Sequence, residues 1–131
     1  MADNQFTNRK RAIARLRAIP PSVRAAARAE LDVQAAFLVE QIRPNVPKEH
    51  GDLAASLEWH RSPRRDKIVN VITEGRNQPG DDKGRKARAV EFGRPDMAAQ
   101  PHFFPTYRAN RKRMRAAVMR AVRAAIKKVI S

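Results

Sequence analysis

Residues 103–130 read FFPTYRANRKRMRAAVMRAVRAAIKKVI, and this stretch decides more of the fold than any other. Its apolar residues recur at intervals of four, three, four and four, the spacing of one face of an α-helix: Met114, Val118, Ala121, Ala125 and Val129. Four basic residues fall together on the opposite face: Arg113, Arg120, Arg123 and Lys127. We therefore expect a long, basic, amphipathic terminal helix that begins at Phe103 or Pro105 and ends at Ile130.

A second long helix is predicted from Pro21 or Ser22 to Arg43. Its apolar stripe has spacings of four, three and four: Leu31, Ala35, Leu38 and Ile42. Pro44 should end it, because the residue before a proline avoids the α region. The stripe lasts only about two heptads, which favours packing within the domain over a coiled-coil seam.

Short elements fill the region between these helices. Residues 57–60 alternate apolar and polar, and residues 67–73 are β-branched and apolar, so both read as strands, paired antiparallel. Residues 44–51 are expected to be a loop, Asp52 to cap a helical turn through Ser56, and residues 86–92 to form a helical turn that leads into a strand. Gly93 to Pro101 reads as another loop.

The predicted fold class is α+β: a small antiparallel sheet of about three strands, packed against a long helix in the N-terminal half and the long terminal helix. Residues 1–20 form a basic segment, with a helical stretch from Asn8 to Ala18, and residues 21–131 form one domain. Residues 74–85, rich in glycine and aspartate, are expected to be a mobile loop with no part in the core.

The chain has 131 residues, the length of one domain, and 28 basic against 13 acidic side chains, a formal charge of +15. Residues 1–28 hold seven basic residues and one acid, and residues 101–131 hold nine and none, so the excess lies at the two ends. Such a charge attracts nucleic acid, anionic membranes or an acidic protein, and it is also a common aid to solubility.

Composition also excludes several classes of protein. There is no cysteine, so disulfides and thiolate chemistry are excluded. No apolar run reaches the roughly 18 residues that span a bilayer, and residues 1–8 do not resemble a signal peptide. A soluble protein made in the cytoplasm, without a membrane partner, is expected.

Enzymatic signatures are missing from the sequence. His50, His60 and His102 lack metal-ligand spacing and are expected to be surface or partly buried imidazoles. No serine lies in a nucleophile elbow, the acidic pair at residues 81–82 reads as a solvated turn, and the glycines do not form a phosphate-binding loop. We predict no catalytic, metal or cofactor site.

Two motifs are notable for the local backbone structure that they indicate. In residues 90–93, Val-Glu-Phe-Gly, a lone acid between apolar residues precedes a glycine, which indicates either a carboxylate held in place before a tight turn or an ordinary strand end. In residues 100–105, Gln-Pro-His-Phe-Phe-Pro, two prolines stiffen the start of the terminal helix. Phe103 and Phe104 point different ways, so at least one is expected in the core.

Three segments together resemble the head–tail joining proteins of long-tailed phages, prophages and gene transfer agents. Residues 51–57 resemble that family's Gly-x-Leu-x-x-Ser-(Ile/Leu) element, residues 87–93 its Ala-x-x-Val-Glu-Phe-Gly signature, and residues 101–105 its Pro-Phe-x-x-Pro-Ala element. The resemblance covers residues 22–131 and carries over these positions as structural: Gly51, Leu53, Ser56, Val90, Glu91, Phe92, Gly93, Pro101, Phe103 and Pro105. The sequence departs from the family pattern at five positions: His50, Lys86, Arg94, His102 and Thr106.

The resemblance implies a structural virion protein and not an enzyme. It implies a homo-oligomeric ring, of six copies, between the portal or head adaptor and the tail terminator or tail tube, assembled in the host cytoplasm and located at the head–tail junction. Glu91 and Phe92 would then lie at a subunit contact or support one. Basic residues would contact passing DNA or an acidic partner: Arg9, Lys10, Arg11, Arg113, Arg120, Arg123 and Lys127. The alternative is a non-specific nucleic-acid-binding protein that acts through its basic helices, and a nuclease is the third, weakest hypothesis.

Overall fold

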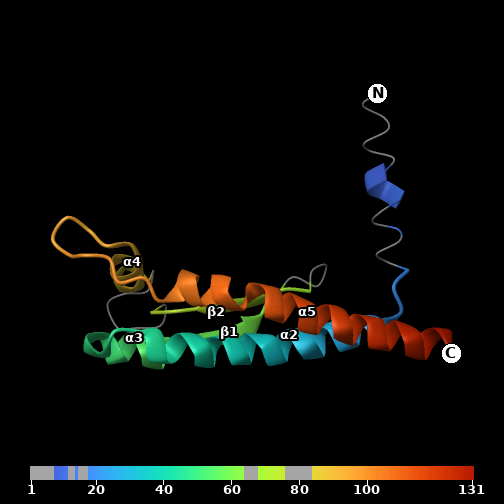
Figure 1. Cartoon of the computed structure of the whole chain (residues 1–131). Coiled ribbons are helices and arrows are strands. Elements are labelled where there is room, and N and C mark those ends of the chain that lie inside the picture. The colour runs from blue at the N-terminus through green and yellow to red at the C-terminus, as the bar shows by residue number, and fades with distance from the viewer. Residues whose placement is uncertain (1–7, 12–13, 15–17, 64–67, 76–83) are drawn as a thin grey trace.

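The computed structural model describes residues 8–11, 14, 18–63, 68–75 and 84–131. It is an α+β fold, as the sequence predicted (Figure 1). After a short helical piece at residues 8–11, the elements follow in this order: α2 Pro21–Ile42, the 3₁₀ turns η1 Arg43–Asn45 and η2 Lys48–His50, α3 Gly51–Ser56, β1 Glu58–Arg61, β2 Asn70–Thr73, α4 Arg85–Phe92 and α5 Phe103–Ile130.

The two long helices, α2 and α5, lie antiparallel along each other and form the body of the molecule (Figure 1). Both predicted helices are confirmed, and α2 ends at Ile42, one residue earlier than expected. Pro21 begins α2, where a missing backbone N–H costs nothing. Pro105 is the third residue of α5, still within the first turn, so it also interrupts no helical hydrogen bond.

The core lies where the end of α2 meets α3, α4 and the start of α5. Its buried residues come from all of these elements except α5: Leu38, Val39, Ile42, Val46, Leu53, Leu57, Ala87 and Val90. Trp59, Ile72, Phe103 and Met114 pack against this cluster. The core therefore fixes α4 and the beginning of α5 in one place.

The sheet has two strands among the residues that the structure describes, where about three were expected. β1 and β2 pair antiparallel, with Trp59 opposite Ile72. The first strand lies one residue later than predicted, because Leu57 is buried in the core after α3. The second begins only at Asn70, and residues 64–67 lie outside the described residues. Asp32 on α2 accepts hydrogen bonds from Arg61 and from Asn70, which attaches both strands to that helix.

The predicted loop at residues 44–51 is instead two 3₁₀ turns. Arg43 keeps αR backbone angles even though a proline follows it, because Pro44 sits inside the first 3₁₀ turn, where its N–H is not required. The Arg43 guanidinium donates to the Ala54 carbonyl and holds this corner. Asp52 does not cap α3, which begins at Gly51, and its carboxylate pairs with Lys86.

The predicted turn and strand at residues 86–92 are instead one α-helix, α4, without a following strand. Gly93 ends it with φ 77°, while its N–H donates to Ala89 O at 2.8 Å. A Cβ on Gly93 would lie 2.9 Å from Ala99 N and 3.0 Å from Met97 O, so both conformation and space require glycine here. Residues 93–101 then form the expected loop, with one isolated bridge between Arg94 and Met97. No helix in the described part of the chain combines the length and the apolar character needed to cross a bilayer.

Candidate functional site

The Glu91 carboxylate caps the first turn of α5. Its Oε2 accepts hydrogen bonds from His102 N at 2.8 Å and Phe103 N at 2.9 Å, and its Oε1 accepts one from Phe104 N at 3.1 Å. The first N–H groups of a helix have no partner within the helix, and the helix dipole favours a negative charge there. No side chain at the N-cap position of α5 makes a capping bond, so a carboxylate from α4 takes that role. The lone acid of the Val-Glu-Phe-Gly motif is therefore held in a defined place.

The surroundings of Glu91 keep it ionised although only 5% of the residue is exposed. Burial pushes the pKa of Glu91 up, but the three backbone N–H donors and the nearby His102 ring outweigh burial, and the net pKa is lowered. The carboxylate is thus charged at neutral pH. The first N–H groups of α5 therefore have a charged acceptor.

His102 is buried, with 2% of the residue exposed, so the prediction of a surface or partly buried imidazole is wrong. Its Nε2 lies 2.6 Å from Glu74 Oε1, and its Nδ1 lies 3.0 Å from Gln100 O and 3.2 Å from Glu91 Oε2. A contact of 2.6 Å between a ring nitrogen and a carboxyl oxygen needs a proton between them. Burial is the largest influence on Glu74 and raises the pKa of its carboxyl. The ring therefore joins the end of β2 to the start of α5.

The prediction that residues 74–85 take no part in the core is wrong at the start of that segment. The Glu74 side chain is 6% exposed, and Gly75 is buried. Gly75 N donates to Ser56 Oγ at 2.7 Å, while the Ser56 hydroxyl donates to Leu53 O at 2.6 Å. Residues 76–83, the middle of the predicted mobile loop, lie outside the described residues.

These contacts give the Gly-x-Leu-x-x-Ser element a physical role at two of its positions. Leu53 is fully buried in the core, and the Ser56 hydroxyl accepts a hydrogen bond from Gly75 N, just after the end of β2. Gly51 has φ −59°, and a methyl group added at its Cα would meet no atom within 4 Å, so nothing in the structure requires a glycine there.

The Pro-His-Phe-Phe-Pro segment divides between core and surface. Phe103 packs against the core, as expected for at least one of the two phenylalanines, and Phe104 is 40% exposed. Pro101 and Pro105 are exposed on either side. Thr106, one of the departures from the family pattern, donates to His102 O at 2.6 Å.

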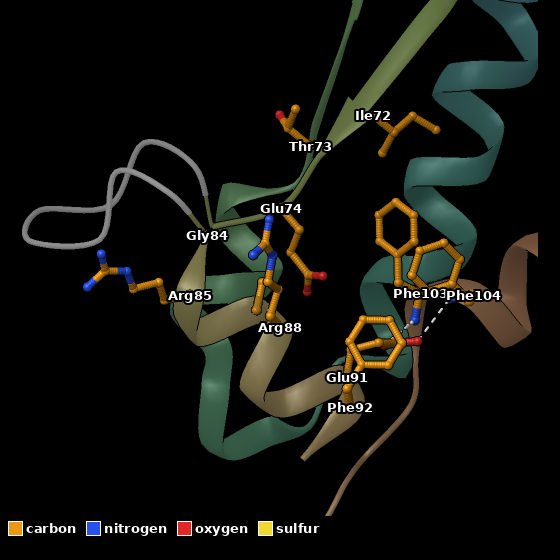
Figure 2. A pocket seen from close by; sticks show the side chains of 11 residues that line it. Ile72, Thr73, Glu74, Gly84, Arg85, Arg88, Glu91, Phe92, Phe103 and Phe104 are labelled. Atoms are coloured by element: carbon orange, nitrogen blue, oxygen red, sulfur yellow. Dashed lines mark hydrogen bonds between the residues drawn. The ribbon is translucent and has the colours of Figure 1, made fainter. Parts of the chain in front are cut away.

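An aromatic cluster lies next to this junction, formed by the exposed rings of Phe92 and Phe104 and the partly buried ring of Phe103. The centroids of the Phe92 and Phe104 rings are 5.7 Å apart, and those of Phe103 and Phe104 are 5.4 Å apart. Phe92 is 66% exposed although it follows a buried acid. Figure 2 shows the three rings grouped beside Glu91, with Arg85 and Arg88 toward the start of α4.

The cluster forms one wall of an open cleft of about 780 Å³. β2, the start of α4 and the start of α5 supply the other walls; the lining residues are Ile72, Thr73, Glu74, Gly84, Arg85, Ala87, Arg88, Glu91, Phe92, Phe103 and Phe104. Within the described residues there is no group of three histidine or acidic side chains arranged to hold a metal ion. We call the cleft lined by these eleven residues the aromatic cleft.

The basic residues predicted to meet DNA or an acidic partner lie apart from the aromatic cleft. Arg113, Arg120, Arg123 and Lys127 are exposed along α5, and Arg9, Lys10 and Arg11 are exposed in the helical piece at residues 8–11. The Arg113 guanidinium lies 4.7 Å from the centre of the Phe37 ring, a cation–π contact at the edge of the α2–α5 interface. Arg113 therefore also packs against α2, which its predicted position on the far face of the helix did not anticipate.

Three features of this junction were not predicted from the sequence. They are the contact of Glu74 with His102, the burial of His102, and the hydrogen bond that the Asn45 side chain donates to Thr106 Oγ1 at 3.0 Å. One signal was available, because His102 stands between two motif positions, Pro101 and Phe103. Glu74 carried no such signal.

Comparison with known proteins supports the motif resemblance. Residues 10–93 match the HK97-gp10-like family, described as "Bacteriophage HK97-gp10, putative tail-component". This range contains α2, α3, both strands, α4 and two of the three motifs; the Pro-His-Phe-Phe-Pro segment and α5 follow it. No curated protein and no solved structure matches the chain significantly. With well over half of its length matched, the chain belongs to the HK97-gp10-like family of tail-related structural proteins of bacteriophages.

Proposed function

We propose that this chain is a subunit of the head–tail junction of a long-tailed phage, prophage or gene transfer agent. It forms a ring of six copies that joins the portal or head adaptor to the tail terminator or tail tube, and packaged DNA passes through the ring. The observation that carries this proposal is that the family motifs build a rigid corner which presents an exposed aromatic pair, Phe92 and Phe104. Buried acidic and histidine side chains at this corner hold elements together, which suits a docking protein of a tail-component family.

Contact between copies has a candidate surface at the far end of α5. α5 has 28 residues and α2 has 22, and Figure 1 shows the C-terminal end of α5 reaching past the start of α2. At a rise of about 1.5 Å per residue, the difference in length is about 9 Å. Ile126, Val129 and Ile130 are exposed along this end. An apolar patch at one end of an elongated subunit suits a heterologous contact, and such contacts generate a ring when the rotation between neighbouring copies closes.

The exposed basic residues suit a ring around DNA. Arg120, Arg123 and Lys127 lie on one helix without an acidic residue in α5. Contacts of such residues with phosphates are independent of sequence and weaken steeply with salt. This suits a channel through which any sequence must move.

Electron cryomicroscopy of intact particles, with the gene present or deleted, tests the proposed position. Density for the chain at the collar, together with separate full heads and tails in the deletion, is expected. Joined, infectious particles in the deletion would refute the proposal. Light scattering of the purified chain, alone and with its tail or adaptor neighbours, measures the copy number.

The alternative, a non-specific nucleic-acid-binding protein, is favoured by the same exposed basic residues. Salt-dependent DNA binding alone does not separate the two functions. Tight binding by the isolated chain together with its absence from purified particles would support the alternative.

A further inference from the structure

The aromatic cleft combines exposed rings with a rigid frame. Phe92 comes from the end of α4 and Phe104 from the first turn of α5, and their ring centroids are 5.7 Å apart. Glu91 ties the two elements together through three backbone N–H groups, and Gly93 admits no side chain in its turn. The rings are therefore positioned before any partner arrives, which lowers the entropic cost of binding.

The charge that the cleft offers to solvent is positive. Its two carboxylates are engaged within the protein, Glu91 by the α5 backbone and Glu74 by His102. Arg85 and Arg88 line the cleft and are exposed on α4. In Figure 2 Arg85 lies across the view from the three rings, and Arg88 lies between them. Apolar rings beside guanidinium groups fit a ligand that carries both an apolar side chain and negative charge.

We propose that the aromatic cleft docks an acidic segment of a neighbouring virion protein, with one bulky apolar side chain seated against Phe92 and Phe104. This inference rests on the proposed function for the source of the partner. Local charge argues against a second copy as the occupant: the exposed apolar end of α5 is flanked by the exposed Lys127 and Lys128, which would meet Arg85 and Arg88.

The test uses the full chain and two short synthetic peptides without tryptophan. Both are rich in aspartate and glutamate; one has a central Leu-Phe pair, and the other has Ser-Ser in its place. Fluorescence anisotropy of the labelled peptides gives their affinities. We expect the Leu-Phe peptide to bind about ten- to a hundredfold more tightly, the gain from burying one or two apolar side chains.

Two variants locate the binding. Phe92→Ser should abolish the difference between the peptides, whereas Val33→Ser, which alters an exposed apolar residue on α2, should leave it unchanged. In Phe92→Trp, the Leu-Phe peptide should shift the new tryptophan's emission to the blue. Equal binding of the two peptides, an unchanged preference in Phe92→Ser, or no emission shift would overturn the proposal.

Light scattering of Phe92→Ser separates this inference from the proposed function. We expect the same oligomer as for the unaltered chain. Loss of the oligomer in Phe92→Ser would assign the cleft to a second copy and overturn the acidic partner. A chain absent from purified particles would refute the proposed function, while the peptide preference would still report on the cleft.

Discussion

Replacing Glu91 with alanine should destabilise the domain by about 3–5 kcal/mol, a large part of the roughly 5–15 kcal/mol that holds a domain of this size together. The structure sets this magnitude. Three backbone N–H groups lose a charged acceptor at 2.8–3.1 Å, in a site where the residue is 5% exposed. A buried donor left without a partner costs about 1–3 kcal/mol, and water entering the space left by the side chain recovers part of the sum.

Glu91→Gln separates the charge from the shape. The amide oxygen still accepts from one side, but the amide nitrogen faces an N–H donor, so we expect a cost of about 1–3 kcal/mol. The matched control is Glu40→Gln, which removes an exposed carboxylate paired with Arg43 on the helix surface and should cost less than about 0.5 kcal/mol. Urea unfolding followed by the fluorescence of Trp59, the single tryptophan, measures all three variants.

The pH dependence gives a second measurement on Glu91. Its pKa is lower in the folded protein than the ordinary value of 4.5, so its contribution is present above pH 4.5 and is lost as the pH falls through the folded value. The difference in the free energy of unfolding between Glu91→Gln and the unaltered chain should therefore be smallest at low pH. If Glu91→Ala and Glu40→Gln cost the same at pH 7, the capping argument is wrong.

Three further predictions concern the junction and the basic helix. Gly93→Ala should cost about 2–4 kcal/mol, because φ is +77° and the methyl group would meet backbone at 2.9 Å, whereas Gly51→Ala should be neutral or slightly stabilising; thermal unfolding compares the two. Glu74→Gln should flatten the pH dependence of stability above pH 4.5, since burial raises the pKa of Glu74 and its contribution is present below pH 4.5 and lost as the pH rises through the folded value; urea midpoints across pH measure this. The double variant Arg120→Glu, Arg123→Glu should weaken DNA binding and reduce the slope of log affinity against log salt by about 2, measured by anisotropy with duplex DNA.

Each of these predictions has an outcome that contradicts it. Equal losses in the two glycine variants would remove the steric argument for Gly93. A Glu74→Gln protein with an unchanged pH profile would show that this carboxyl does not titrate between the folded and unfolded states. An unchanged salt slope in the double arginine variant would place the DNA contacts elsewhere.

Local sequence patterns were sufficient to predict the two long helices and the family. The spacing of apolar residues in α2 and α5 and the prolines at their first turns specify each helix within its own segment, so periodicity alone located both nearly to the residue. Strand limits were less accurate, because Leu57 is apolar whether it lies in a strand or in the core after α3, and only packing distinguishes the two. The order of the short motifs along the chain likewise sufficed to indicate the family that residues 10–93 match.

Tertiary structure alone decided what the motif residues do. Glu91 lies 11–13 residues from the N–H groups that it caps, and Glu74 lies 28 residues from His102. Burial of a polar side chain is favourable only where such partners converge, and their convergence depends on how whole elements pack. The same packing left Phe92 outside, although the sequence Val-Glu-Phe suggests the opposite order of burial. The sequence by itself therefore determined which elements form and to which family they belong, and the fold determined which carboxylate is buried and which ring is exposed.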